Sequence, residues 1–526
     1  MPSNKKWFWL AALVSAWLFD FLFWSKPIGV SFFIWLAVLM AAGFLLAGIE
    51  GKRPSWRSLL IAVLTAFFAS VNAWRGQEMI RMISALLAFG GLLLLAATFL
   101  NGFWPWYRLR DYLVEFMRVL AGGFTGGVRL LNQPKEQTPS DGPGNKTAWR
   151  RLLPILRGVL IALPIVAVLG VLLSSADPVF GDWMKQVFNL EKLPEYLFRL
   201  FYILVIGFIL VGVYLNAVHP SGKVEKPAPN TPWVKTFLGW TETGIILGAV
   251  VLLFLTFIFI QVRYLFGGAA NISETGYTYA EYARRGFGEL LGVAALSLML
   301  YLVLGSVAKL ESRFARTGFK VLAVALMASV LVILASSLQR LMLYEDAYGF
   351  SQLRTYTHIL IVWLAALITV TIVFELLSRR GHFALALLAC VVGFGITLAV
   401  INVDGFIIDR NVARARAGSE LDVNHINSLS ADAVPALLRN YQSAGLPQEV
   451  KDGLGAALAC RQKLLEDTTP RPWQAFNLSQ ARAARLLKSN SQLWNGYHPY
   501  KDQFGSWKIF IEGEPVFCNG SGYGMD

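Results

Sequence analysis

Long apolar runs separated by short polar loops dominate the first 402 residues of the chain. A helix needs about 20 mostly apolar residues to cross a bilayer. Eleven runs have this length: 7–24, 28–49, 58–74, 79–101, 152–173, 196–218, 240–262, 287–307, 317–338, 357–377 and 381–402. Because backbone polar groups find no water inside lipid, each run is predicted to be a helix. The expected fold class is an all-α polytopic membrane protein with about eleven transmembrane helices.

The spans and the polar stretches between them predict four regions. These are a four-helix N-terminal membrane region (1–103), a cytoplasmic amphipathic helix and linker (104–151), a seven-helix membrane core (152–402) and a C-terminal soluble domain (403–526).

The segment that follows the fourth span has the spacing of an amphipathic helix. Its apolar residues recur every three or four positions: Leu109, Tyr112, Leu113, Phe116, Met117 and Leu120. This pattern predicts a helix lying in the membrane interface. The alternative is a soluble amphipathic helix packed on the inner end of the bundle. We expect Gly122, Gly123, Gly126 and Gly127 to make the next stretch flexible, and 132–147 is typical of a linker.

The C-terminal 124 residues are polar enough to form a soluble domain, predicted to be mainly helical. Ser430 has the position of a helix N-cap, and 447–466 and 473–488 are predicted helices. Alternating residues in 507–518, on either side of Glu512-Gly513, predict a small β-hairpin.

Composition excludes two other classes of protein. Hydrophobic residues make up 56% of the chain, charged residues 15%, and the mean hydropathy is +0.52. A soluble globular protein has roughly 45–50% apolar and about 25% charged residues, and a disordered chain has low hydrophobicity.

The net charge of +14 would suggest a nucleic-acid partner in a soluble protein, but here the positions of the charges matter more. Lys and Arg collect in the short cytoplasmic loops of membrane proteins. With the N-terminus inside, 22 of them fall in inside segments and 11 in outside loops and span ends. The expected partner is therefore the lipid bilayer and not nucleic acid, with the C-terminus outside. In an oxidising exterior Cys460 and Cys518 can form a disulfide; the alternative is two unrelated thiols.

Ionisable and aromatic residues gather at the predicted outer ends of the later spans. The candidate cluster comprises Arg263, Tyr264, Glu281, Arg284, Arg285, Glu289, Arg340, Tyr344, Glu345, Asp346, Arg354, His358 and Asp404. One interpretation is an outward-facing pocket in which Arg clamps an anionic lipid or envelope ligand. The other is a set of interface anchors, because Tyr and Arg are common at membrane surfaces. Asp20, in the first span, is a separate candidate whose alternative role is to reach lipid headgroups.

Several kinds of site are missing from the sequence. It has no phosphate-binding loop, no His-Glu-x-x-His zinc motif, no Gly-x-Ser-x-Gly elbow and no dinucleotide fingerprint. No cofactor and no metal site are therefore predicted.

Five segments carry a resemblance to a known family: 174–180, 263–268, 277–287, 343–350 and 402–406. The run Tyr-Ala-Glu-Tyr-Ala-Arg-Arg-Gly-Phe at 279–287 is the most specific of them. Across roughly 150–450 the chain resembles a bacterial polytopic membrane family of unknown function, family 4173, which is related to family 4153. The resemblance implies a protein of the bacterial inner membrane; in that membrane, the Lys and Arg positions predict a cytoplasmic N-terminus and a periplasmic C-terminal domain. It implies no reaction, ligand or catalytic residue.

Three functions follow from these observations. The first is an envelope receptor, sensor or scaffold, supported by the long folded tail and by the missing enzyme motifs. The second is a membrane enzyme acting on a lipid-linked or anionic envelope substrate at the outer leaflet, for which acid, Arg and Tyr residues are suited. The third is a transporter, which would show mid-membrane charges and repeated halves.

Overall fold

The structure, a computed structural model, describes residues 2, 4–131, 193–220, 236–265, 287–467, 471–511 and 513–519, with isolated positions between 162 and 180. Within these ranges ten helices are long and apolar enough to cross a membrane, which confirms a polytopic all-α fold. The fifth predicted span, 152–173, lies largely outside the described residues.

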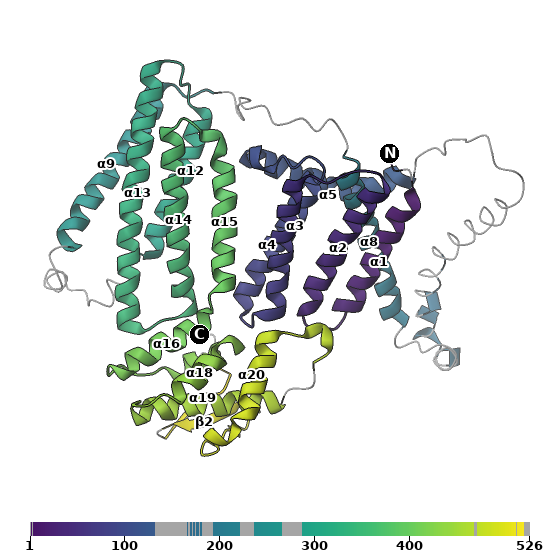
Figure 1. Cartoon of the computed structure of the whole chain (residues 1–526), viewed down its shortest axis with the longest axis vertical. Coiled ribbons are helices and arrows are strands. Elements are labelled where there is room, and N and C mark those ends of the chain that lie inside the picture. The colour runs from purple at the N-terminus through teal and green to yellow at the C-terminus, as the bar shows by residue number, and fades with distance from the viewer. Residues whose placement is uncertain are drawn as a thin grey trace, which may run out of the picture.

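The N-terminal helix group consists of two hairpins, a connecting helix and one later helix (Figure 1). Its members are α1 (Lys5–Phe23), α2 (Val30–Ile49), α3 (Trp56–Trp74), α4 (Glu78–Thr98), α5 (Leu109–Leu131) and α8 (Leu193–Val218), with a short η1 turn (Trp104–Trp106) before α5. Phe8, Leu36 and Phe68 are fully or almost fully buried in its core.

The second helix group packs beside the first. It contains α9 (Trp240–Leu265), α12 (Phe287–Val307), α13 (Arg313–Tyr348), α14 (Gln352–Leu376) and α15 (Phe383–Val400), with η2 (Arg380–His382) before α15. The helix α15 joins the two groups, because Phe383 packs in the second core and Val392 against the first.

The tail covers the end of both groups that lies opposite the N-terminus (Figure 1). It contains α16 (Val403–Arg416), α17 (Val423–Ser428), η3 (Ala431–Ala433), α18 (Val434–Tyr441), α19 (Gln448–Asp467), η4 (Trp473–Ala475), α20 (Leu478–Ser489), η5 (Ser491–Trp494), β1 (Tyr500–Lys501), β2 (Trp507–Ile511) and β3 (Glu514–Phe517). The three strands form an antiparallel sheet in the order β1-β2-β3.

Three local predictions for the tail are confirmed and one needs a change. The predicted helix 447–466 is α19. The Ser430 hydroxyl accepts a hydrogen bond from the Asp432 N–H, so Ser430 is an N-cap. The predicted hairpin is β2 and β3, with Ile511 opposite Glu514. The predicted helix 473–488 is divided into η4 and α20, because Asn477 is extended and caps α20.

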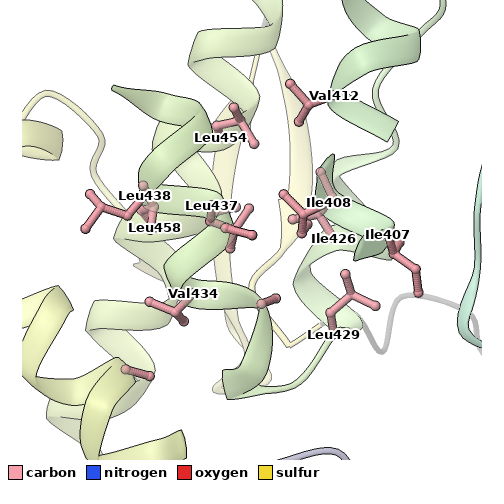
Figure 2. Packing of buried hydrophobic residues seen from close by; sticks show 14 of the residues in the cluster. Ile407, Ile408, Val412, Ile426, Leu429, Val434, Leu437, Leu438, Leu454 and Leu458 are labelled. Atoms are coloured by element: carbon pink, nitrogen blue, oxygen red, sulfur yellow. The ribbon is translucent and has the colours of Figure 1, made fainter. Parts of the chain in front are cut away.

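Figure 2 shows buried apolar residues at the centre of the tail, and the core to which they belong continues into the ends of the membrane helices. Ile407, Leu437 and Leu454 are fully buried at its centre. The same core includes Val71 at the end of α3 and Leu398 at the end of α15. Burial of apolar surface therefore holds the tail against the bundle.

The glycines that follow the amphipathic pattern do not interrupt the helix, which corrects the expected flexible stretch. All four lie inside α5, and they pack against α8. A Cβ on Gly126 would stand 2.6 Å from the Cα of Gly212 in α8. Glycine is needed here because the two backbones approach too closely for any side chain.

The helix α13 is longer than its predicted span, 317–338, and ends at Tyr348. Its 36 residues extend about 54 Å at 1.5 Å per residue, while the hydrocarbon core is about 30 Å thick. Gly349, with φ +82°, ends the helix. The last turns of α13 therefore project beyond the span and reach the tail.

Candidate functional site

The candidate site is the docking interface, by which we mean the contact between the tail and the helix turns at residues 29–30, 75–77 and 349–352. Each turn joins two membrane-spanning helices and exposes backbone groups that no helix satisfies. Tail residues bond to all three turns. The interface therefore touches both helix groups at once.

The turn between α3 and α4 is held by two buried tail side chains. The Asp432 carboxylate accepts from the N–H groups of Gly76 (2.9 Å) and Gln77 (3.3 Å), which stand at the N-terminus of α4. The Asn477 amide donates to the carbonyls of Asn72 (3.1 Å) and Arg75 (2.6 Å). A carboxylate is favourable there because the N-terminal end of a helix is electropositive.

The turn between α13 and α14 is held by α16. The Asn411 amide donates to the Phe350 carbonyl (2.9 Å) and accepts from the Phe350 N–H (2.8 Å). Arg414 donates to the carbonyl of Asp346 at 2.8 Å. A Cβ on Gly349 would lie 2.7 Å from the Arg414 guanidinium. Because glycine has no side chain, the guanidinium can lie against the backbone of this turn.

Asp404, in the first turn of α16, connects this turn to the tail core. Its carboxylate accepts from the Gln352 amide (2.7 Å) and from the Ser430 N–H (2.8 Å), and it is 1% exposed. Its neighbour Asn402 caps α16 and donates to the Asp432 carbonyl (2.9 Å). Asp404 thus links a membrane helix to the segment that carries Asp432.

Two arginines, the buried Arg75 and the half-buried Arg461, lie near these carboxylates. Arg75 donates to the carbonyls of Ala399 (2.7 Å) and Val400 (2.6 Å), and burial lowers its pKa, with Asp432 and Asp404 acting in the opposite sense. Burial lowers the pKa of Arg461 to about 10. Arg461 donates to three carbonyls, those of Ile426, Leu429 and Ser430.

His425 lies close to the same region, in α17. Burial lowers the pKa of His425, with the positive charge of Arg354 acting in the same sense. Asp422 and Asp404 act in the opposite sense. The imidazole is therefore favoured in its neutral form in the folded tail.

Several predicted cluster residues meet where α13 ends and α14 begins, on the side of the bundle that carries the tail. Glu345 is 2% exposed, and its carboxylate lies 3.2 Å from Nδ1 of His358. The Arg354 guanidinium stands 4.0 Å from the centre of the Tyr344 ring and donates to the Gly349 carbonyl. These four side chains make contacts within the protein, between the two helix ends.

The other cluster residues are dispersed or lie outside the description. Glu289 is exposed in the first turn of α12, Asp346 is exposed near the end of α13, and Arg340 is half-buried in α13. The helix α9 includes Arg263 and Tyr264, whose side chains are not described. Glu281, Arg284 and Arg285 lie outside the described residues.

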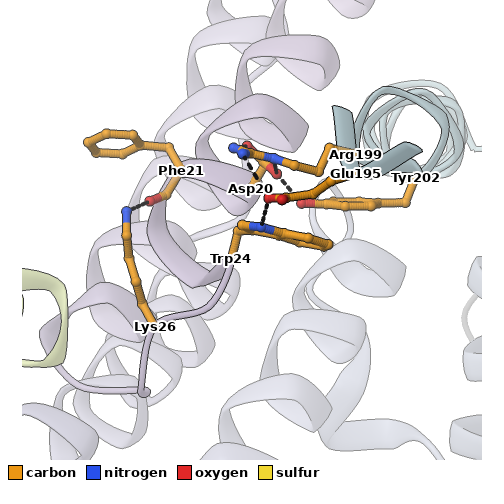
Figure 3. Close-up of polar contacts among 7 residues, drawn as sticks. All are labelled: Asp20, Phe21, Trp24, Lys26, Glu195, Arg199 and Tyr202. Atoms are coloured by element: carbon orange, nitrogen blue, oxygen red, sulfur yellow. Dashed lines mark hydrogen bonds and ion pairs between the residues drawn. The ribbon is translucent and has the colours of Figure 1, made fainter. Parts of the chain in front are cut away.

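Asp20 is buried between α1 and α8 rather than extended toward headgroups (Figure 3). Arg199 donates to both of its oxygens, at 2.8 and 2.5 Å, and the Tyr202 hydroxyl also donates to it. The Trp24 indole donates to Glu195 at 2.7 Å on the adjacent turn. A buried charge at the edge of a membrane is stabilised by such pairing.

Sequence reasoning missed Arg199, Asp432 and Asn477 as site residues. A signal was present for the first, because Glu195, Arg199 and Tyr202 are spaced to share one face of α8. For Asp432 and Asn477 the signal was weaker. Asp432 follows the cap at Ser430 and Asn477 itself caps α20, but the partner of each lies hundreds of residues away in the sequence.

The structure joins Cys460 in α19 to Cys518 after β3 as a disulfide, with Cα atoms 5.0 Å apart. The bond connects the sheet to the helix that carries Arg461. Within the described ranges, no three His, Cys, Asp or Glu side chains are grouped so that they can hold a metal ion.

Comparison with curated proteins and with solved structures finds no match to the chain. A family model does match, and it begins well before residue 150, where the resemblance started, and continues into α18. The match includes the membrane helices and the first tail helices, and it ends before Asn477. The chain therefore belongs to the family described as "Domain of unknown function (DUF4153)", whose model covers residues 8–440.

Proposed function

We propose that the protein is an envelope receptor, sensor or scaffold of the bacterial inner membrane, with the tail and its docking interface in the periplasm. The observation that carries this proposal is that the tail bonds to turns of both helix groups, through Asp432 and Asn411. A movement of one group against the other strains these bonds. The tail is thus suited to report the arrangement of the helices or to present a fixed surface.

The proposed orientation is supported by the charges and by the disulfide. The turns at the N-terminal end of the bundle carry Lys52, Arg53, Lys309 and Arg379, as expected for cytoplasmic loops. A bond between Cys460 and Cys518 is stable in an oxidising compartment such as the periplasm. The narrower relation to family 4173 is part of the same proposal.

The contacts of the polar cluster favour this function over an enzyme. Asp404, Glu345 and Arg354 bind or pair with other residues of the chain. An enzyme needs such groups to face its substrate. In the described cluster these three groups hold helix ends and the tail instead.

The orientation is tested with reporters fused to the C-terminus. Alkaline phosphatase is active only in the periplasm, whereas green fluorescent protein exported there unfolded does not fluoresce. We expect an active phosphatase fusion and a dark fluorescent fusion. The reverse pattern contradicts the periplasmic tail.

The role of the tail is tested by complementing a strain that lacks the gene. The undocking variant Asp432→Ala is compared with Asp409→Ala, which removes an exposed carboxylate, and with Glu289→Gln and Asp346→Asn in the polar cluster. At equal abundance in the membrane, we expect only Asp432→Ala to reproduce the transcript profile of the deletion strain. An enzyme predicts the opposite, with loss of function in the cluster variants and not in the undocked tail.

A further inference from the structure

The tail segment 471–478, here called the anchor segment, exposes large apolar side chains. Trp473 is 55% exposed, Phe476 49% and Leu478 55%. Gln474, Ala475 and Asn477, between them, are buried. The segment therefore has an inner face against the bundle and an apolar outer face.

The inner face is fixed by backbone contacts, so the outer face cannot turn inward. The Phe476 carbonyl accepts from the N–H of Val30 at 2.9 Å, and Asn477 bonds to the turn after α3. A Cβ on Gly29 would lie 2.5 Å from the backbone of Ala475. This close approach places the anchor segment directly on the turn between α1 and α2.

The outer face continues the exposed face of α1. The ring of Trp473 lies 6.4 Å from that of Phe21, which stacks on Trp17 at 5.7 Å. Phe21 is 41% exposed and Trp17 is 56% exposed, although both belong to a helix apolar enough to span the membrane. Exposed apolar residues on such a helix face lipid. Trp17, Phe21 and Trp473, here called the aromatic row, therefore lead from the lipid-facing side of α1 onto the tail.

Cations border this aromatic row. Lys26 lies 4.7 Å from the centre of the Phe21 ring and donates to the Phe21 carbonyl at 2.6 Å. Arg471 is exposed at the start of the anchor segment and is an electrostatic neighbour of Arg81 near the start of α4. Apolar and aromatic groups beside Lys and Arg are typical of elements that lie at the level of phospholipid headgroups.

We propose that the anchor segment is an interfacial membrane anchor. Trp473, Phe476 and Leu478 lie in the bilayer interface beside the lipid-facing end of α1, and Arg471 and Lys26 bind phospholipid phosphates. The anchor holds the tail at a fixed depth and couples its position to the lipid as well as to the helix turns. It does not depend on the proposed function, because the geometry is the same whichever face of the membrane the tail occupies.

The test places a fluorescent probe at position 476 of the full-length protein. In a Cys390→Ala background, which removes the one free cysteine among the described residues, Phe476→Cys is labelled with bimane without reductant. Phe504→Cys is the matched control, because Phe504 is 83% exposed in the turn between β1 and β2. Both proteins are placed in nanodiscs of phosphatidylethanolamine and phosphatidylglycerol, with and without a lipid that carries a nitroxide on its acyl chain.

We expect the nitroxide lipid to quench the probe at position 476 several-fold more strongly than the probe at position 504. Equal quenching at the two positions overturns the proposal. So does a blue-shifted but unquenched probe at 476, which indicates contact with protein and not with lipid. If Phe476→Cys fails to fold, Leu478→Cys gives the same reading from the same outer face.

Discussion

Removal of the Asp432 carboxylate is expected to release the tail from the turn between α3 and α4. In Asp432→Ala the N–H groups of Gly76 and Gln77 lose their acceptor. Asp432 is 6% exposed, so water does not readily replace it. The substitution therefore leaves two donors unsatisfied at the start of a helix.

The magnitude follows from the kind of bond. A hydrogen bond to a charged group contributes about 1.5–3 kcal/mol, so two of them give about 3–6 kcal/mol. Part of this is recovered if the turn opens to water, and about 3 kcal/mol is a reasonable net value. The opening equilibrium then increases by a factor of roughly 100.

Hydrogen exchange followed by mass spectrometry measures this opening in the intact protein in nanodiscs. We expect peptides from 75–80 and 430–437 to exchange roughly 100-fold faster in Asp432→Ala than in the wild type, in proportion to the opening equilibrium. The matched control is Asp409→Ala, which removes a surface pair with Arg439 that contributes at most about 1 kcal/mol. If the two variants exchange equally, the docking interface does not hold the tail and the reasoning is wrong.

Three further predictions concern other parts of the molecule. Arg199→Ala leaves the buried Asp20 charge unpaired and is expected to lower the free energy of unfolding by about 3–5 kcal/mol; thermal unfolding in detergent should show a smaller loss when both residues are replaced by Leu. Gly126→Leu forces a side chain into the α8 backbone and should speed hydrogen exchange in α5, while Gly90→Leu, whose Cβ meets nothing within 4 Å, should not. Because the pKa of His425 is lowered in the folded tail, the unfolded chain binds a proton more readily, and the stability of the tail should fall as the pH falls below about 6.5. Thermal unfolding at several pH values should show a weaker pH dependence in His425→Gln than in the wild type. An unchanged dependence would contradict this role of His425.

The amino-acid sequence by itself determined the class of the protein and much of its local structure. Run length and hydropathy predicted the helices because a segment in lipid must satisfy its own backbone. The cap at Ser430 and the hairpin near Gly513 were also predictable, since each depends on residues within a few positions. The extension of α13 beyond its predicted span was not predictable, because the last turns of this helix are polar and are stabilised by the tail.

The tertiary structure alone decided which polar residues meet. Asp432 bonds to a turn 356 residues away and Asp20 pairs with a residue 179 positions later, and no local pattern encodes either partner. It also decided that the glycines of α5 form a helix contact, since the closeness of Gly126 to α8 depends on how the helices pack. The physical reason is that periodicity describes one element at a time, whereas a buried charge or a backbone crossing depends on which surfaces packing brings together.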